Sequence, residues 1–381
     1  MADGAGPNIA AVGSHRVVAR FEVGSTRFVE PDGSTLGALP AWTADRDAMV
    51  GLYRAMVLTR TFDARAVALQ RSGQLGTFPS SLGQEAVAVG TGAALRADDV
   101  LVPSFREQGA QLWRGVTLVE LLLYWGGDER GSDFAGPRED FPISVPVGSH
   151  ASHAAGVALA FQLRREPRVA LCVIGDGATS KGDVYEAVNF AGVRRLPVVF
   201  VVNDNQWAIS VPRSAQTAAT TLAQKAIAAG IDGEQVDGND VVAVRERVGA
   251  AVERARAGEG PTVVEAVTYR LADHTTADDA GRYRDEAEVS ARWAHEPLAR
   301  MRALLVGRGW WGRDEEEDLL VDTRERVEAA VADYLEIGPL PPTAMFDHLH
   351  AELPTFLRAQ RDEVARRFPV DTVRPAGDGV G

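Results

Sequence analysis

The sequence predicts an α/β fold in which helices flank a doubly wound, mainly parallel sheet, with helical extensions at the N- and C-terminal ends. Two short apolar runs, at 169–174 and 196–202, are rich in valine and isoleucine, which is typical of parallel strands buried on both faces. A helical pattern at 184–194 supplies the crossover that parallel strands need. A second helix–strand pair at 240–258 and 261–269 repeats this order and supports the same fold.

Composition excludes several classes of protein. The 381 residues, 45% hydrophobic and 24% charged, suffice for one large α/β domain with extensions or for two smaller domains. A net charge of −13 argues against nonspecific nucleic-acid binding. The single cysteine, Cys172, lies in an apolar run and is expected to be a buried, inert thiol. No apolar run is long enough to span a membrane, and no secretory or mitochondrial targeting pattern opens the sequence, so we expect a cytoplasmic protein.

Both ends of the chain are expected to be extensions of a central domain at 41–340. Residues 1–40 are predicted to be a mobile N-terminal extension. Within it, alternating apolar residues at 16–29 and a turn signal at 30–33 suggest a small hairpin. Residues 341–381 are predicted to be a C-terminal helical extension that contacts other subunits.

A long helix is expected at the start of the central domain. Thr43 and Asp45 are candidate caps, and apolar residues recur at helical spacing to about residue 72. Charged residues of this helix, such as Arg60 and Asp63, are expected on a solvated face or in ion pairs. A glycine- and serine-rich loop follows, and then a second helix that opens near Gln84.

Two polar loops follow the buried strands. Asp176 stands in a Gly-Asp-Gly turn after the first strand, and residues 203–205 read Asn-Asp-Asn after the second. The carboxyl ends of parallel strands form the ligand-binding edge of an open α/β sheet. One carboxylate, one amide oxygen and a loop carbonyl suit Mg²⁺, and the N–H groups that follow Gly177 suit an anion. The residues alone therefore predict a Mg²⁺–diphosphate site.

Three further segments are candidates for the same site. Arg106 follows an apolar strand end, where it can form two hydrogen bonds to a phosphate or a surface salt bridge. The segment 141–150 precedes a helix of small residues at 151–163, and it is interpreted either as a cofactor contact or as a capped helix start. The polar loop 269–284 contains His274, although a lone loop histidine is usually just exposed to solvent.

These motifs resemble those of one family. A Gly-Asp-Gly turn followed about thirty residues later by an Asn-containing loop resembles the thiamine diphosphate motif. The longer string EAVNFA…LPVVFVVNDNQWAIS resembles the alpha subunit of the decarboxylating first component of 2-oxo acid dehydrogenase complexes, which include the pyruvate and branched-chain enzymes. The resemblance covers about 40–370 and is strongest over 168–284. It implies a thiamine diphosphate-binding fold in which 41–340 forms the diphosphate half of the site.

The resemblance also assigns roles to individual positions. The implied ligands of Mg²⁺ are Asp176, Asn205 and the backbone carbonyl of Trp207. The implied contacts of thiamine diphosphate are Phe105, Arg106, Val145, Val147, Asp176, Gly177, Ala178, Asn203, Asn205 and His274. His274 is the implied catalytic residue, and its loop would be held by Arg270, Asp278, Asp279 and Tyr283. Imidazole titrates near neutrality, so His274 is suited to donate a hydrogen bond or a proton to the substrate.

Other positions are assigned by resemblance with alternatives. Ser144, Pro146 and Ser149 fall where some branched-chain members bind a monovalent cation, which would be K⁺. Phe78 either lines the acyl pocket or packs within its loop. Lys181 is interpreted as a solvated lysine or as a phosphate or partner contact.

The sequence departs from the family pattern at several positions. Phe105 stands where tyrosine is common, His150 replaces a common glutamine, and Asp273 replaces His, Gly or Pro. Thr275 occupies the position of a regulatory phosphoserine in mitochondrial relatives. We therefore expect no phenol hydrogen bond at position 105.

The resemblance implies oxidative decarboxylation of a 2-oxo acid and transfer of the acyl group to the lipoyl group of an acyltransferase component. Branched-chain 2-oxo acids are favoured over pyruvate. In two-chain members the carboxylic acid that activates the cofactor lies on a separate beta subunit, and no second half is visible here. We therefore expect an alpha2-beta2 heterotetramer and an alpha chain that is inactive alone. The alternatives are an acetoin dehydrogenase alpha subunit, a noncatalytic scaffold, and a nucleotide-binding oxidoreductase, although GDGATSKG lacks the spacing of a nucleotide loop.

Overall fold

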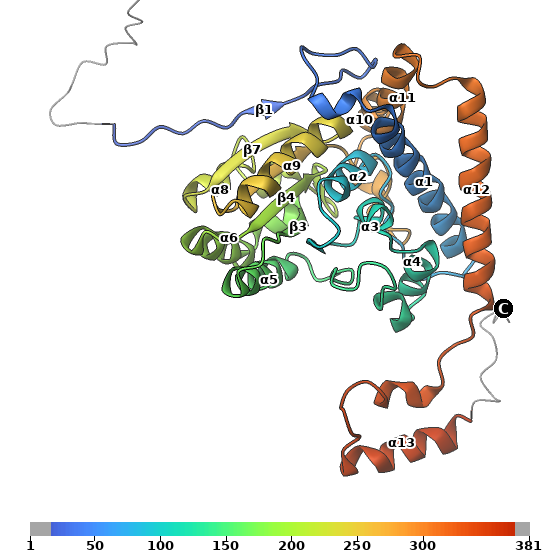
Figure 1. Cartoon of the computed structure of the whole chain (residues 1–381). Helices are drawn as coiled ribbons and strands as arrows, with labels where there is room; N and C mark the ends of the chain where they lie inside the picture. The colour runs from blue at the N-terminus through green and yellow to red at the C-terminus, as the bar shows by residue number, and fades with distance from the viewer. Residues whose placement is uncertain (1–16, 370–381) are drawn as a thin grey trace, which may run out of the picture.

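The computed structural model describes residues 17–369, so the first 16 residues of the predicted mobile extension and the last dozen of the predicted C-terminal extension lie outside the described part. A six-stranded parallel sheet forms the centre of the molecule (Figure 1). Across the sheet the strands run β1 (Ser25–Thr26), β7 (Asp232–Asp237), β8 (Thr262–Val267), β4 (Val198–Asp204), β3 (Ala170–Gly175) and β2 (Val100–Val102). The predicted α/β fold with a doubly wound parallel sheet is confirmed.

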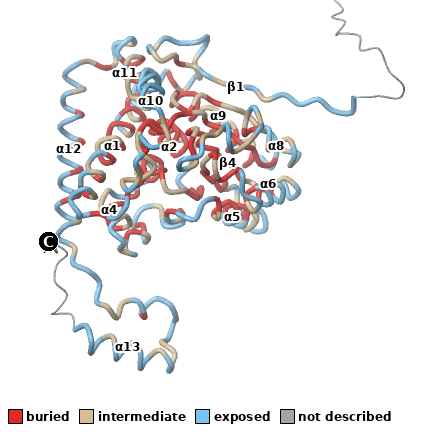
Figure 2. Tube along the Cα trace, turned by 180° about the vertical axis from the view of Figure 1, so that it is seen from behind, coloured by how far each residue is buried: buried red, intermediate tan, exposed pale blue. Residues whose placement is uncertain are grey.

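Helices cover both faces of the sheet. Alternate strand residues point to opposite faces, so Cys172 and Phe200 pack under α5 (His150–Arg164) and α6 (Gly182–Arg194). Their neighbours Leu171 and Val199 pack under α9 (Val241–Arg256) and part of α2 (Glu85–Ala93) on the other face. Figure 2 shows the buried residues concentrated in these layers. Cys172 is fully buried, and burial raises the pKa of its thiol, as expected for an inert cysteine.

Further helices pack outside the second layer. α1 (Arg46–Arg71) contacts α2, α11 (Pro297–Gly307) and α12 (Arg313–Glu336), and α12 contacts α4 (Leu118–Trp125). The short α3 (Gln108–Arg114) lies against α2. None of the helices in the described residues is long and apolar enough to cross a membrane.

Aspartate caps begin two of the predicted helices. Asp45 accepts hydrogen bonds from the N–H groups of Asp47 and Ala48 at the start of α1, as predicted. Thr43 is not the cap, because its hydroxyl donates to the carbonyl of Pro40. Asp240 caps α9 with one carboxylate oxygen. Its other oxygen accepts from the N–H groups of Phe28 and Val29.

The hairpin suggested for the N-terminal region is reduced to one antiparallel bridge between Val29 and Thr35. Gly33 closes the predicted turn with a φ of 82°, a conformation that favours glycine. The preceding residues join the main sheet instead, because β1 pairs in parallel with β7. This part of the predicted extension is therefore packed against the central domain.

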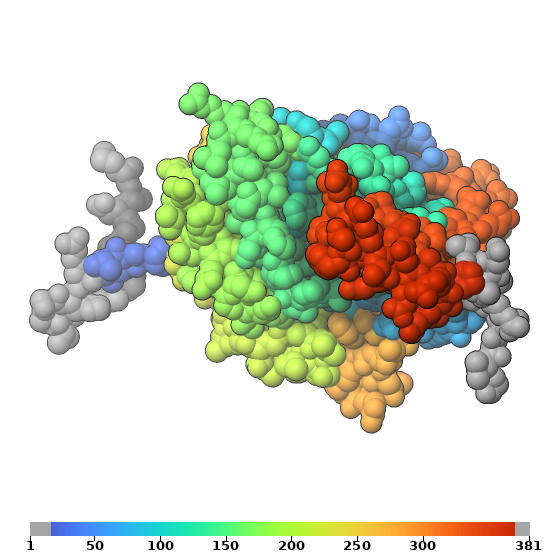
Figure 3. Space-filling model, turned by 90° about the horizontal axis from the view of Figure 1, so that it is seen from below, coloured from blue at the N-terminus to red at the C-terminus, as the bar shows by residue number. Residues whose placement is uncertain are grey.

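The C-terminal region forms a helical unit that stands apart from the sheet. After α12 come a 3₁₀ turn at Pro342–Phe346 and α13 (Thr355–Arg367). In Figure 1 this unit hangs below the main body, and in Figure 3, seen from below, it lies in front of the body. No residue of α13 is buried, and Phe356 is 70% exposed. A helical extension matches the sequence prediction; its role in subunit contacts stays a prediction.

Candidate functional site

The two polar loops meet at the carboxyl edge of the sheet. Gly175, the last residue of β3, pairs in register with Asn203 near the end of β4. The turn after β3 is a 3₁₀ helix at Asp176–Ser180, and the loop after β4 leads into a small hairpin of β5 (Trp207–Ala208) and β6 (Val211–Pro212). A Cβ atom at Gly177 would lie 2.6 Å from that of Ala208. Glycine is therefore needed where the two loops touch.

Asp176 is the buried carboxylate of the first loop. Its Oδ2 accepts a hydrogen bond from Nε2 of Gln216 at 2.9 Å. Burial raises the pKa of this carboxyl, while the hydrogen bonds from Gln216 and from the N–H of Gly177 act in the opposite direction. A bound divalent cation would favour the ionised form of this carboxylate.

The second loop presents oxygen atoms in a fixed conformation. The amide of Asn205 donates to Oε1 of Gln84 at 2.9 Å, which orients its Oδ1 towards the N–H of Trp207 at 3.2 Å. Gln206 has a φ of 72°, an uncommon value outside glycine that turns the chain at this point. The Oδ1 atom of Asn203 is buried and has no hydrogen-bond partner among the described residues.

Asp204 has a structural role that the sequence did not indicate. Its Oδ2 lies 2.9 Å from Nε of Arg213, and its side chain is buried. Burial, together with the charge of nearby Asp176, raises the pKa of Asp204 to about 8, although Arg213 opposes the shift. The residue therefore belongs to an ionic cluster behind the loop.

Arg106 is buried, so the surface salt bridge considered as an alternative is wrong. Its guanidinium donates to the carbonyl of Ser80 at 2.7 Å, and to the carbonyl and Nδ1 of His274 at 2.6 and 2.8 Å. It forms no ion pair within residues 17–369. Burial and the charge of Arg270 lower the pKa of Arg106 to about 9. Neither Arg106 nor Arg270 has a carboxylate ion-pair partner among the described residues, and such guanidinium groups can attract an anion.

These contacts define the protonation of His274. Arg106 and Arg270 approach Nδ1 as donors at 2.8 and 3.4 Å, so Nδ1 must act as an acceptor. Burial and the charges of both arginines lower the pKa of His274 to about 4. The imidazole is therefore neutral above about pH 5 and carries its proton on Nε2.

Arg270, Asp278 and Tyr283 hold the loop that contains His274, as the resemblance implied, whereas Asp279, the fourth implied residue, is exposed. Asp278 accepts hydrogen bonds from the N–H of His274 and from the hydroxyl of Tyr283. Arg270, which is fully buried, donates to Tyr283 at 2.9 Å. Asp273, where the sequence departs from the family pattern, adds a bond by accepting from the N–H of Ala280 at 3.0 Å.

Asp63 was expected on a solvated face or in an ion pair, and that expectation is wrong, because the side chain is buried against neutral donors. The side chain is 4% exposed and accepts from the hydroxyl of Ser80 and the N–H of Ser81, both at 2.6 Å. These bonds fix the loop whose Ser80 carbonyl holds Arg106. Arg60, in contrast, pairs with Glu85 and Glu296, as expected for an ion-pairing residue.

Phe78 and Phe105 lie near the His274 loop in different environments. Phe78 is fully buried, with its ring edge-to-face against Phe62 and Trp125, so core packing accounts for the side chain. The acyl-pocket role has no support from these contacts. The Phe105 ring stands edge-to-face with His274 at 6.0 Å and contributes no hydroxyl group.

The candidate cation segment brings its oxygen atoms together. The Ser144 and Ser149 hydroxyls lie 3.2 Å apart, and Ser149 donates to the carbonyl of Pro146 at 2.9 Å. Val145 and Val147, the implied cofactor contacts, are 52% and 46% exposed. The cation role stays a prediction.

Lys181 and His150, which lie near the Asp176–Ser180 turn, differ in how far they are buried. Lys181 is exposed and pairs with Asp183 at 3.3 Å, which matches the interpretation as a solvated lysine. His150, in contrast, is buried against the carbonyl of Val173 at 2.7 Å from Nε2, and burial lowers its pKa. His150 therefore packs behind the cation segment as a neutral core residue.

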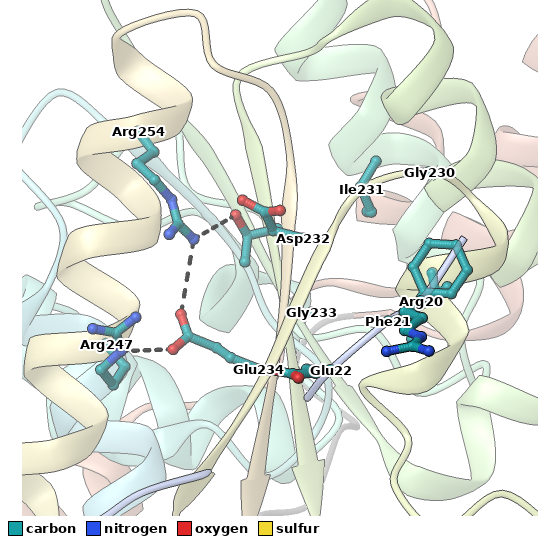
Figure 4. Close-up of a pocket in the computed structure, with 12 residues that line it drawn as sticks. Arg20, Phe21, Glu22, Gly230, Ile231, Asp232, Gly233, Glu234, Arg247 and Arg254 are labelled. Atoms are coloured by element: carbon teal, nitrogen blue, oxygen red, sulfur yellow. Dashed lines mark hydrogen bonds and ion pairs between the residues drawn. The ribbon is translucent and has the colours of Figure 1, made fainter. Parts of the chain in front are cut away.

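A cavity of about 470 Å³ lies at the opposite edge of the sheet, beside the first residues of β7 and β8 (Figure 4). Three of its charged side chains pair with one another. Glu234 contacts Arg247 at 2.6 Å and Arg254 at 3.8 Å. The predicted site residues do not line this cavity.

The site has an amide-rich set of candidate metal ligands. Within residues 17–369, no cluster of three or more His, Cys, Asp or Glu side chains is arranged to hold a metal ion. The predicted set of one carboxylate, one amide oxygen and one carbonyl does not require such a cluster. Trp207, the predicted carbonyl ligand, has its indole held by the hydroxyl of Tyr269 at 3.2 Å.

The chain is similar in sequence to known dehydrogenase E1 components. Residues 53–339 match the family model of the dehydrogenase E1 component. The chain is 44% identical over 315 residues to the 3-methyl-2-oxobutanoate dehydrogenase subunit alpha of Mycobacterium tuberculosis, covering 82% of this chain and 85% of that protein. It is 37% identical over 342 residues to the pyruvate dehydrogenase E1 component subunit alpha of Staphylococcus epidermidis, covering 90% and 92%. The corresponding Staphylococcus aureus subunit is 39% identical over 315 residues, covering 82% and 85%.

Proposed function

Because the chain belongs to the dehydrogenase E1 component family, we propose that it is the alpha subunit of a 2-oxo acid dehydrogenase. Its activity is oxidative decarboxylation of a branched-chain 2-oxo acid, with transfer of the acyl group to the lipoyl group of an acyltransferase component. The 44% identity to a 3-methyl-2-oxobutanoate dehydrogenase subunit, against 37% and 39% to pyruvate dehydrogenase subunits, supports the branched-chain substrate. We propose a beta subunit as its partner in an alpha2-beta2 assembly in the cytoplasm.

The site fits thiamine diphosphate with Mg²⁺, as expected for this family. The observation that supports it most directly is the pair of buried arginines, Arg106 and Arg270, which face the same imidazole without a carboxylate partner among the described residues. Asp176, Asn205 and the carbonyl of Trp207 would hold the metal. When bound, thiamine diphosphate supplies the electron sink for decarboxylation.

The remaining predicted contacts complete the proposed cofactor site. Arg106, Asn203 and the N–H groups of Gly177 and Ala178 would bind the diphosphate. The Oδ1 atom of Asn203 is buried without a partner, as expected for a group that meets a ligand or water there. Val145 and Val147, with Phe105, would contact the organic part of the cofactor.

The protein's own contribution to the reaction is proton placement and charge. His274 holds a proton on Nε2, so it can donate a hydrogen bond to the carboxylate or carbonyl oxygen of the 2-oxo acid. Arg106 and Arg270 keep Nδ1 in the acceptor role and so keep the donor on the other side of the ring. The loop bonds to Asp278 and Tyr283 fix the direction of that donor.

Substrate assays test the proposed function. The chain would be co-expressed with a candidate beta subunit from the same organism, and CO₂ release would be followed with pyruvate, 2-oxoisovalerate, 2-oxoisocaproate and acetoin. We expect kcat/KM for the branched-chain acids to exceed that for pyruvate by about 10-fold or more, because one or two methylene groups in a pocket contribute about 1–3 kcal/mol. Preference for acetoin would assign the alternative dehydrogenase, and no turnover of any substrate would contradict the enzymatic proposal.

Substitution of His274 tests its role as a neutral donor. We expect His274→Leu to lower kcat about 10²-fold, because leucine cannot donate a hydrogen bond and general acid and hydrogen-bond donors contribute at least this much. A pKa of about 4 predicts that His274 stays neutral between pH 5 and 8. The acid limb of the kcat profile should therefore keep its midpoint in the variant. A limb that disappears with the histidine would show that its protonation controls the rate.

The matched control is Thr275→Ala at the neighbouring position. The Thr275 hydroxyl accepts from the N–H of Ala277 at 3.3 Å, a local bond within the loop. This variant should retain most of the activity. Mass spectrometry of native protein would show whether Thr275 is ever phosphorylated; persistently unmodified protein would remove that hypothesis.

A further inference from the structure

Both loops of the proposed metal site are contacted by one segment, residues 213–225, which we call the bridging segment. It begins with α7 (Arg213–Gln216) and ends in α8 (Gln224–Ala228). No local sequence pattern indicates this role, because the segment is short and contains neither a strand nor a long helix. Its contacts are made by three side chains, from Arg213, Gln216 and Lys225.

The two ends of the bridging segment are fixed to the sheet by one buried carboxylate. Glu265 in β8 lies 3.5 Å from Nη2 of Arg213 and accepts from the N–H of Ala223 at 3.0 Å. Arg213 also pairs with Asp204 at 2.9 Å, at the end of β4. Leu222 is buried in the core beside these contacts. The segment is therefore held as a rigid bridge and not as a free loop.

Two side chains of the bridging segment contact the first of the proposed metal-binding loops, Asp176–Ser180. Gln216 donates from Nε2 to Oδ2 of Asp176 at 2.9 Å, and the same group donates to the carbonyl of Val211 at 3.2 Å. Lys225 donates to the carbonyl and hydroxyl of Thr179 at 2.5 and 2.9 Å, three residues beyond Asp176. Arg213 holds the second loop through Asp204. One segment thus sets the positions of both loops.

We propose that the bridging segment fixes the spacing of the two metal-binding loops, and that Gln216 is a positioning residue that orients the Asp176 carboxylate towards Mg²⁺. A hydrogen bond to Oδ2 defines the plane of the carboxylate and so the direction of its free lone pairs. Groups that hydrogen-bond to a metal-ligating side chain typically contribute 10- to 100-fold to metal affinity. This inference rests on the proposed function, because it concerns the same Mg²⁺–thiamine diphosphate site.

The test replaces Gln216 with a residue of similar length that cannot donate. Gln216→Met would be compared with the wild type as assembled alpha–beta complexes, with Mg²⁺ titrated at a fixed thiamine diphosphate concentration. Binding would be followed by tryptophan fluorescence, since Trp207 lies in the second loop. We expect the Kd for Mg²⁺ to rise at least about 10-fold. At saturating Mg²⁺, kcat should stay within about twofold, because the loss acts on metal affinity.

Two controls separate positioning from folding. Ser214→Ala changes an exposed residue on the same turn and should leave the Kd unchanged. The melting temperature of the metal-free complex should be the same in Gln216→Met and in the wild type. An unchanged Kd for Mg²⁺ would overturn the role of Gln216. A lower melting temperature that explains the weaker Mg²⁺ binding by partial unfolding would also overturn it. A wild-type complex that binds no thiamine diphosphate with Mg²⁺ would instead overturn the proposed function itself.

Discussion

Substitution of Asp176 with asparagine is expected to lower kcat of the assembled enzyme at least about 10³-fold and to abolish Mg²⁺-dependent cofactor binding. Asparagine keeps the volume and can still accept the hydrogen bond from Gln216, so the change removes mainly the negative charge. That charge belongs to the carboxylate that is proposed to bind Mg²⁺, and the Mg²⁺ in turn is proposed to bind the diphosphate. Removing a single group that stabilises charge in an active site can cost 10²- to 10³-fold, and here both metal and phosphates depend on it.

Nearby Asp204 should not replace the lost carboxylate. It is committed to Arg213 at 2.9 Å, and burial together with the charge of Asp176 raises its pKa, which disfavours the ionised form that a metal ligand needs. The binding of thiamine diphosphate and Mg²⁺ would be measured by calorimetry on the complex, with turnover measured in parallel. Asp183→Asn, a partly exposed position on α6 paired with Lys181, is the matched control.

The stability of the cofactor-free complex should not fall in the Asp176→Asn variant. Burial raises the native pKa of this carboxyl above its ordinary value. The ionised form is therefore disfavoured in the folded state at neutral pH, where the unfolded chain carries the charge freely. Removing the charge should leave the melting temperature unchanged or higher. If the variant bound the cofactor with full affinity, Asp176 would not be a ligand of the metal.

The sequence was sufficient where local patterns determine the structure. The runs that form β3 and β4 are apolar on both faces and bounded by turns, so their burial and parallel pairing followed directly. Asp45, a candidate cap, lies before a helical pattern and caps α1. The position of Asp176 followed from the strand before it.

The sequence was insufficient where contacts join distant segments. β7 has the sequence DGEQVD and no apolar run, because it lies near the edge between β1 and β8. Asp63 is buried only because Ser80 and Ser81 fold back over α1. Gln216 meets Asp176 from 40 residues away, and no local pattern indicates that contact. Such roles depend on tertiary packing.

Purified alpha chain without its partner is expected to decarboxylate 2-oxo acids at least about 10⁴-fold more slowly than the assembled complex. Thiamine diphosphate enzymes of this family use a carboxylic acid against the aminopyrimidine ring, and the resemblance assigns that acid to a beta subunit. Loss of such a proton-transfer group alone typically costs 10²- to 10⁴-fold. The alpha chain alone also lacks the part of the cofactor-binding surface that the beta subunit would supply, which should lower the rate further.

The structure has features consistent with a site completed by another chain. Val145 and Val147, proposed to contact the cofactor, are 52% and 46% exposed in the single chain, although cofactor pockets bury most of their ligand. The single six-stranded sheet provides one edge for the proposed diphosphate site. A second domain from a partner would cover these valines and exclude water from His274.

Adding beta subunit to a fixed amount of alpha chain, with CO₂ release as the measurement, distinguishes the possibilities. Activity should rise with added beta subunit and reach a plateau at equimolar chains, as an alpha2-beta2 assembly requires. A beta subunit in which each candidate acid is replaced by glutamine or asparagine provides the control, since assembly should persist while activity is lost. Full activity of the alpha chain alone would place the activating acid within residues 1–381. The buried acids Asp63, Glu85 and Glu107 would then be the first to replace, because burial raises the pKa of each.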